Sequence, residues 1–272
     1  MLYKFCDTNE QPFYVSLPAE ALSYNGKYID EEIPLFRTLY VSGRESFSAD
    51  ISETVLESLD GSVFLRRRLL PRTITVGYQI SAGSAQELME AYNHLNHLMR
   101  PAQVKVSFAD EPDKYYIGTC KSVGVPEPGR LTVKGEIEIY CTDPCKYAKD
   151  TVTIQPESDG IFTFEYGGTV PAYPVFTASF AGDAKQVVLT GNLAVVSAGD
   201  ADSEQNVFSS GDTINIDCGA GKIYLNDVDA PFLGDIANQF EQMTLEFGTN
   251  TITTSYTGTA PVFTMTYREA WL

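Results

Sequence analysis

Residues 73–80 read Thr-Ile-Thr-Val-Gly-Tyr-Gln-Ile and alternate polar with apolar side chains. This period of two predicts a half-buried β-strand. Its inner face would carry Ile74, Val76, Tyr78 and Ile80. Residues 84–87, Ser-Ala-Gln-Glu, then form a capping box, in which the serine caps a helix start and the glutamate reciprocates. Apolar residues at helical spacing follow as far as Pro101, so this stretch predicts one strand and then one helix over about residues 84–99.

Strand patterns dominate the rest of the chain. Further strands are predicted at 104–108, 115–119 and 131–140, the last with Leu131, Val133, Ile137 and Ile139 inward. Residues 149–160 are polar and include a proline, which indicates a domain boundary. Beyond it we predict short strands at 161–166, 174–180, 185–190, 193–196, 212–218, 222–226, 243–247, 250–255 and 261–268. Only residues 235–240 hint at a helical period. Such closely spaced strands are typical of a β-sandwich or barrel.

Composition supports two β domains, 1–150 and 151–272. The chain has 272 residues, of which 43% are apolar and 20% charged, with a formal charge of −17. Residues 1–150 carry 16 Lys+Arg against 21 Asp+Glu, net −5, whereas residues 151–272 carry 3 against 15, net −12. Nucleic-acid binding through phosphates needs clustered bases, so this charge argues against it. No apolar run reaches the roughly 18 residues that span a bilayer, so we expect no membrane insertion.

Catalytic and metal-binding patterns are weak. Cys141 and Cys145 form a short-spaced pair, but two more ligands at similar spacing are missing, so free thiols are the better interpretation. On the predicted helix, His97 lies opposite the apolar stripe and His94 at its border, which favours a solvated face. The sequence has no nucleophile elbow, Walker loop or dinucleotide glycine run. We expect no enzyme, no cofactor and no metal.

Two further features have two interpretations each. Residues 44–60 are polar and irregular, which favours an arm over a core strand. The cluster Arg66-Arg67-Arg68, with Arg72, indicates either a subunit contact or a solvated strand edge. Trp271 near the C-terminus is expected to close the core of the second domain, with sugar stacking as the alternative.

Several stretches resemble the distal tail proteins of long-tailed phages. They are residues 17–29 (Leu-Pro-Ala-Glu-Ala-Leu-Ser-Tyr-Asn-Gly-Lys-Tyr-Ile), 33–45, the 72–76 strand, the turn at 108–116, residues 139–147 and the ending at 267–272. The family more often has an aromatic where Cys145 stands. The resemblance is strong over 1–150 and rests more on domain layout beyond.

The resemblance implies a fold and a place in the virion. The fold is mostly β: an N-terminal β-sandwich with one α-helix and an extended belt arm, and a C-terminal β-sandwich that is galectin-like or similar to a carbohydrate-binding module. Six copies would form a ring at the virion tail tip after synthesis in the host cytoplasm. The expected partners are the chain itself, the tail-tube protein, the tape-measure protein and a tail-associated lysin or fibre.

The arm, taken as about residues 37–60, is our candidate for reaching a neighbouring copy. The candidate interface residues are Arg37, Tyr40, Arg44, Glu45, Phe47, Ile51, Arg66 and Arg68. The main alternative function is a glycan-binding adhesin that uses the C-terminal domain to recognise the host wall. That half has no histidine and Arg268 as its only arginine, which weakens a galactoside-type site. A hydrolase with paired carboxylates is the third alternative.

Overall fold

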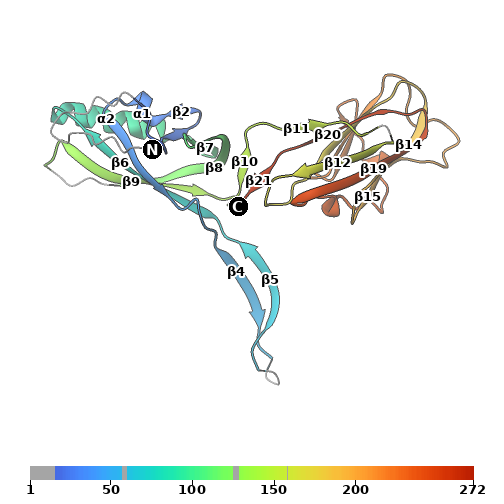
Figure 1. Ribbon diagram of the computed structural model, residues 1–272, viewed down its shortest axis with the longest axis horizontal. Helices are drawn as coiled ribbons and strands as arrows, with labels where there is room; N and C mark the ends of the chain where they lie inside the picture. Colours follow the sequence, from blue (N-terminus) through green and yellow to red (C-terminus); the bar gives the residue numbers. More distant parts are fainter. Residues whose placement is uncertain (1–15, 57–59, 125–128, 158) are drawn as a thin grey trace. The chain divides into compact units, whose positions relative to one another are not determined.

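The computed structural model describes residues 16–56, 60–124, 129–157 and 159–272. The chain divides into two compact units, residues 1–146 and 147–272, whereas we expected the boundary at 150. Both units are built mainly from antiparallel strands (Figure 1), so the prediction of a mostly β fold is confirmed.

The N-terminal unit is built on one path of hydrogen-bonded strands in the order β2-β1-β7-β8-β9-β6-β3. These strands are β1 (Leu22–Tyr24), β2 (Lys27–Tyr28), β3 (Phe36–Ser42), β6 (Arg72–Ser81), β7 (Val104–Phe108), β8 (Glu111–Val123) and β9 (Thr132–Cys141). The long strand β8 pairs with β7 through its first part and with β9 through its second. Both halves of the path therefore contribute to one apolar core.

The helix prediction is confirmed at α2 (Ala85–Leu98). Ser84 caps it by accepting a hydrogen bond from the backbone N–H of Glu87, and Gly83 N–H donates to the Glu87 carboxylate. Ala91, Leu95 and Met99 of this helix bury against the sheet. A second helix, α1 (Ile29–Glu32), was not predicted because four residues are too few to show a helical period.

Alternation correctly identified the inner faces of two central strands. Ile74, Val76, Tyr78 and Ile80 of β6 are fully buried, as are Ile137 and Ile139 of β9. Leu131 is the exception: it lies before β9 begins and is 42% exposed. His94 and His97 are exposed on α2, as expected.

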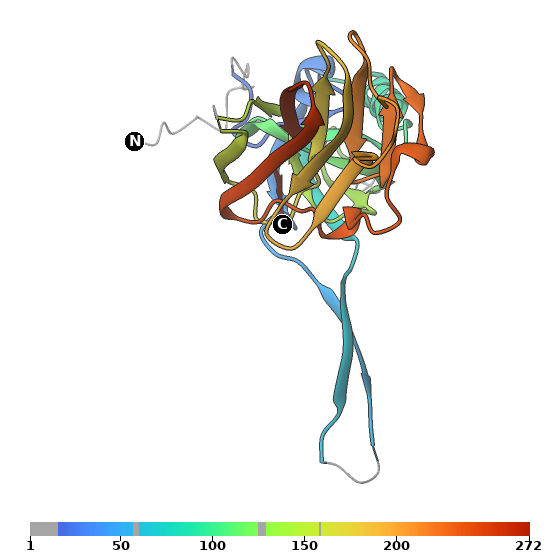
Figure 2. The same ribbon diagram turned by 90° about the vertical axis from the view of Figure 1, so that its right-hand side faces the viewer.

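The predicted arm differs from the observed one in its limits. Residues 36–42 form β3, which pairs with β6 in the sheet rather than standing apart. The segment without sheet partners is a hairpin of β4 (Ala49–Thr54) and β5 (Val63–Leu69), whose strands pair only with each other. It is seen as a two-stranded ribbon in Figures 1 and 2. The predicted arm ended at residue 60 and so did not include β5. Three consecutive arginines interrupt the alternation of polar and apolar residues in that strand.

The C-terminal unit consists of two sheets that enclose one apolar core. One sheet has the order β11-β20-β13-β16-β17-β18 and the other β12-β19-β14-β15. Rings from both sheets meet in the core, as Phe162 of one sheet does with Phe176 of the other, with centroids 6.1 Å apart. This arrangement is a β-sandwich.

Eight of the nine strands predicted for this unit are present with similar bounds, and β11, β18 and β21 were not predicted. The observed strands are β11 (Val152–Ile154), β12 (Ile161–Tyr166), β13 (Val175–Ser179), β14 (Ala184–Thr190), β15 (Val195–Gly199), β16 (Thr213–Asp217), β17 (Lys222–Leu225), β18 (Val228–Asp229), β19 (Gly248–Gly258), β20 (Val262–Tyr267) and β21 (Ala270–Trp271). Strand β10 (Lys146–Ala148) spans the boundary between the units.

Three predicted features of this unit differ from the structure. Residues 243–247 are not a strand, since only Leu245 makes an isolated bridge, to Ala172. Two 3₁₀ turns, η1 (Pro231–Leu233) and η2 (Phe240–Gln242), flank the segment for which a helical period was suggested. Trp271 is half-buried rather than a core residue, and its indole N–H donates to Gly167 O at 3.0 Å.

Candidate assembly site

The β4–β5 hairpin has no core of its own. Among its described residues, 49–56 and 60–69, none is buried. Its large apolar side chains are instead exposed: Ile51 59%, Val55 72%, Leu56 44%, Val63 41%, Phe64 63% and Leu65 59%. An isolated two-stranded hairpin is at best marginally stable in water, and clustered exposed apolar side chains mark interaction surfaces. The hairpin therefore needs a partner surface.

The register of the hairpin sorts its side chains into two faces. Ile51 lies opposite Arg67, whose guanidinium is 5.0 Å from the centroid of the Phe47 ring. Asp50 and Ser52 lie opposite Arg68 and Arg66, and Arg66 Nε donates to Ser52 Oγ at 3.2 Å. The pairing shifts between Ser52 and Glu53, which leaves Leu65 as an extra residue in a β-bulge. One face thus carries Ile51 with Arg67, and the other carries Asp50 and Ser52 with Arg68 and Arg66.

The three adjacent arginines keep their charges free for a partner. Within the described part of the chain, no carboxylate lies within ion-pair distance of Arg66, Arg67 or Arg68. Each of them is exposed.

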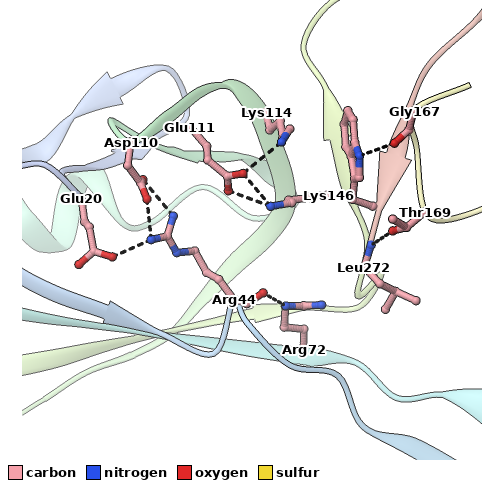
Figure 3. A network of polar contacts seen from close by, with 11 residues as sticks. Glu20, Arg44, Arg72, Asp110, Glu111, Lys114, Lys146, Gly167, Thr169 and Leu272 are labelled. Carbon is pink, nitrogen blue, oxygen red and sulfur yellow. Dashed lines mark hydrogen bonds and ion pairs between the residues drawn. The ribbon is translucent and has the colours of Figure 1, made fainter.

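Arg44 fixes the chain just before the hairpin. Its guanidinium makes two hydrogen bonds to Asp110, at 2.9 and 3.0 Å, and one to Glu20 at 2.7 Å (Figure 3). It also stacks 4.6 Å from the centroid of the Phe108 ring, and its side chain is only 10% exposed. Arg44 was predicted to contact another copy, but its charge is balanced inside its own unit.

Arg72 fixes the chain just after the hairpin. Its Nη1 donates to the carbonyls of Arg44 at 2.6 Å and Gly43 at 3.2 Å, and its Nε donates to Pro144 O at 2.9 Å. The residue is 5% exposed, and its guanidinium lies 5.6 Å from the centroid of the Tyr116 ring. Burial raises the pKa of the Tyr116 phenol to about 12. We call Arg44 and Arg72 the hairpin root.

Glycine at position 43 allows the backbone before the hairpin to lie close to β6. Gly43 has φ +88°, which side-chain-bearing residues rarely adopt, and a Cβ there would lie 2.3 Å from Thr73 O. Glu45 accepts a hydrogen bond from the N–H of Gly43 at 3.1 Å, so this predicted interface residue also helps to shape the turn.

A second ion cluster stands beside the root. Lys146 donates to both oxygens of Glu111 at 2.8 Å, and Lys114 donates to the same carboxylate at 3.1 Å (Figure 3). Burial by itself would raise the pKa of Glu111, but these two lysines outweigh it and hold the pKa below its ordinary value. The cluster joins the start of β8 to the end of the unit.

Two other predicted interface residues are engaged within the sheet. Tyr40 donates a hydrogen bond to Glu136 Oε1 at 2.6 Å, which raises the pKa of the Tyr40 phenol. Arg37 donates to Ser16 O at 2.7 Å. Both lie on β3 and not on the hairpin. The structure therefore groups Phe47, Ile51, Arg66 and Arg68 at the hairpin and places the other four candidates at its root or on the sheet.

The outer edge of β3 is closed to strand pairing. The backbone N–H of Thr38 donates to Asp30 Oδ1 at 2.8 Å, and that of Val41 donates to Glu20 Oε2 at 3.3 Å. Inward-pointing carboxylates of this kind stop an edge strand from recruiting another chain. The hairpin, and not this edge, is the part of the unit suited to a partner.

Sequence reasoning missed Glu20, Asp110 and the true role of Arg72. A signal for Arg72 was present, because the period of two in β6 places it on the same inner face as Ile74 and Val76. Glu20 and Asp110 left no such signal, since they meet Arg44 across 24 and 66 residues of sequence.

No described helix is long and apolar enough to cross a membrane. Over the described ranges, no group of three or more His, Cys, Asp or Glu side chains is placed to hold a metal ion. Cys120, Cys141, Cys145 and Cys218 are free thiols, and burial raises the pKa of Cys141 to about 11.

Comparisons with known proteins show which family has this architecture. The model of the phage tail protein RIFT-related domain matches residues 25–141, and that of the siphovirus-type tail component, C-terminal domain, matches residues 167–271. The distal tail protein of Bacillus phage SPP1 is 24% identical over 211 residues, which cover 76% of this chain and 81% of that protein. The chain belongs to the distal tail protein family of siphoviruses.

The fold agrees with this family. The crystal structure of the SPP1 Dit protein, described as a paradigm of the hub adsorption apparatus in phages that infect Gram-positive bacteria, matches with a TM-score of 0.77 at 18% identity. The match covers 93% of this chain and 99% of that one. As a distal tail protein, this chain is a component of the virion tail tip.

Proposed function

We propose that six copies of this distal tail protein close into a ring through their N-terminal units, with the hairpin of each copy packed against the next copy. The observation that carries the proposal is the hairpin itself, none of whose described residues is buried and six of whose large apolar side chains are exposed. A contact in which one surface of each copy meets a different surface of the next closes into a ring when the rotation is a simple fraction of a full turn.

The ring would join the tail tube to a tail-associated lysin or fibre below it. Its partners would be the tail-tube protein, the tape-measure protein and a tail-associated lysin or fibre. Family membership and the relative's name, distal tail protein, support a position between tail and tip. The N-terminal unit would carry this role, since it holds the hairpin and the root that fixes its two ends.

The mass and shape of the purified chain test the proposal. Light scattering should give a mass about six times the 29.9 kDa of the chain, and negative-stain images should show rings with a central hole. A monomer at all concentrations, or an open filament, would contradict a closed ring.

The alternative function is a glycan-binding adhesin that acts through the C-terminal unit. One observation favours it, namely a groove of about 350 Å³ at an edge of the sandwich, lined in part by Tyr256. Arg268 is not part of this groove; its Nη1 donates to the carbonyls of Ala148 at 2.5 Å and Lys149 at 2.7 Å.

A further inference from the structure

The groove of the C-terminal unit lies where its two sheets part. Its walls are residues 155–157, 159 and 160, which lie between β11 of one sheet and β12 of the other, the far end of β19 and the start of β20. Its volume of about 350 Å³ is at the lower end of the range for small-ligand sites.

Tyr256 reaches this groove because of its place on β19. Asn250, Ile252 and Thr254 alternate along this strand as buried residues that face the other sheet. Tyr256 follows Thr254 by two residues and so lies on the same face of the strand. It is 47% exposed, because the other sheet does not cover this end of β19. The strand thus holds an aromatic ring at the mouth of the inter-sheet space.

The floor of the groove is held by backbone hydrogen bonds. Thr254 N–H and Oγ1 both donate to Gly160 O, at 2.9 and 2.8 Å, and Gly160 N–H donates to Glu157 O at 3.0 Å. Gly160 has φ +79°, and a Cβ there would lie 2.9 Å from Thr254 Oγ1, so only glycine permits this closeness. Pro156 and Pro261 stiffen the two walls. A groove formed before binding saves the entropy of ordering its walls.

Besides the hydroxyl groups of Thr254 and Tyr256, the polar side chains of the groove are an amide and two carboxylates, from Gln155, Glu157 and Asp159. Asp159 is exposed, and its Oδ1 accepts a hydrogen bond from Ile161 N–H at 3.2 Å. No Lys or Arg is among the groove residues, and the whole half of the chain has three. Carboxylates accept hydrogen bonds from hydroxyl groups and repel anions.

We propose that this groove binds a neutral or amino sugar of a glycan chain, with the pyranose ring stacked on Tyr256 and its hydroxyl groups donating to Glu157 and Asp159. Aromatic rings supply a flat apolar face, and the carboxylates fix the orientation of the sugar. Anionic wall polymers are excluded by the same carboxylates. The site deepens the glycan-binding alternative and does not depend on ring formation.

Titration of the full chain with oligosaccharides tests the site. The probes are trimers of a neutral hexose and of N-acetylglucosamine, a glycerol-phosphate polymer and a Lys-rich peptide, each followed by isothermal calorimetry and by NMR. We expect a neutral or amino-sugar trimer to bind, and Tyr256→Ala to weaken that binding by about tenfold or more, equivalent to about 1.4 kcal/mol. The matched control is Tyr173→Ala, since Tyr173 is also 47% exposed in the same unit but lies outside the groove.

Three results would overturn the site. The first is that neither trimer binds up to about 10 mM. The second is that only the anionic polymer or the peptide binds. The third is that Tyr256→Ala and Tyr173→Ala weaken sugar binding equally. Circular dichroism of both variants shows whether they fold, and Tyr256→Phe should retain binding because it keeps the ring. A chain that forms no ring but binds the trimer would refute the ring and leave the groove assignment standing.

Discussion

The guanidinium of Arg72 donates a hydrogen bond to the backbone carbonyl of Arg44 at 2.6 Å. Arg72 follows the second strand of the hairpin, and Arg44 precedes the first, so one side chain ties together the two ends of the segment proposed to reach a neighbour. Arg44 in turn is held by Glu20 and Asp110. The hairpin can therefore lack a core of its own and still be anchored at both ends.

Arg72→Lys should lower the stability of the N-terminal unit. A lysine keeps the charge but cannot donate to three carbonyls from one planar group. Each hydrogen bond from a charged donor contributes about 1.5–3 kcal/mol, so we expect a loss of at least about 2 kcal/mol. Urea unfolding measures it, with the exposed Arg100→Lys as control. Equal midpoints for the two variants would show that the root does not depend on the guanidinium.

Asp110→Asn should make stability less sensitive to acid. Burial alone would raise the pKa of Asp110, but the hydrogen bonds and charge of Arg44 outweigh it, so the pKa lies below its ordinary value of 3.8. A carboxyl with a lowered pKa stabilises the fold above its unfolded pKa, and this contribution is lost as pH falls through the folded pKa. The variant should therefore melt below the natural chain at about pH 7, and the gap should close below about pH 4.

Melting curves between about pH 7 and pH 3 check this prediction. Asp113→Asn is the control, since Asp113 is exposed on β8 three residues after Asp110. A gap between Asp110→Asn and the natural chain that persists unchanged at the acid end would mean that Asp110 does not stabilise the root as a carboxylate.

Ile51→Ser should weaken assembly without weakening the fold. Ile51 is 59% exposed on the hairpin, and Met89 of α2 is a matched control with the same exposure. Surface substitutions usually change stability by less than about 0.5 kcal/mol, so neither variant should lose much melting temperature. Sedimentation velocity should show Ile51→Ser, but not Met89→Ser, shifted toward the monomer. The opposite order would place the interface on α2.

Trp271→Phe should cost less than the loss of a core aromatic. Trp271 is half-buried, and its indole N–H donates to Gly167 O. A neutral hydrogen bond contributes about 0.5–1.5 kcal/mol, whereas truncating a buried aromatic costs about 3–5 kcal/mol. Thermal unfolding distinguishes the two ranges. A loss in the higher range would restore the interpretation of Trp271 as a core residue.

The sequence predicted the features that depend on neighbouring residues better than those that depend on residues far apart in the chain. Alternation and the capping box are local, so β6, β9 and α2 were predicted nearly to the residue. The hairpin was predicted as an arm with wrong limits, because its exposed strands lack the buried half of an alternating pattern. The contacts of Arg44 could not be predicted, since the spacing between Arg44 and its two carboxylates follows no period.

Removing the hairpin tests the central claim most directly. Ala49 and Leu69 are paired, and Leu70 N–H donates to Ser48 O at 2.8 Å, so residues 50–68 can be replaced by Asn-Gly as a two-residue turn that leaves the root intact. Native mass spectrometry of this variant beside the natural chain gives the oligomeric state of each. We predict a hexamer for the natural chain and a folded monomer for the variant. A variant that still forms hexamers would show that copies of this protein meet through another surface.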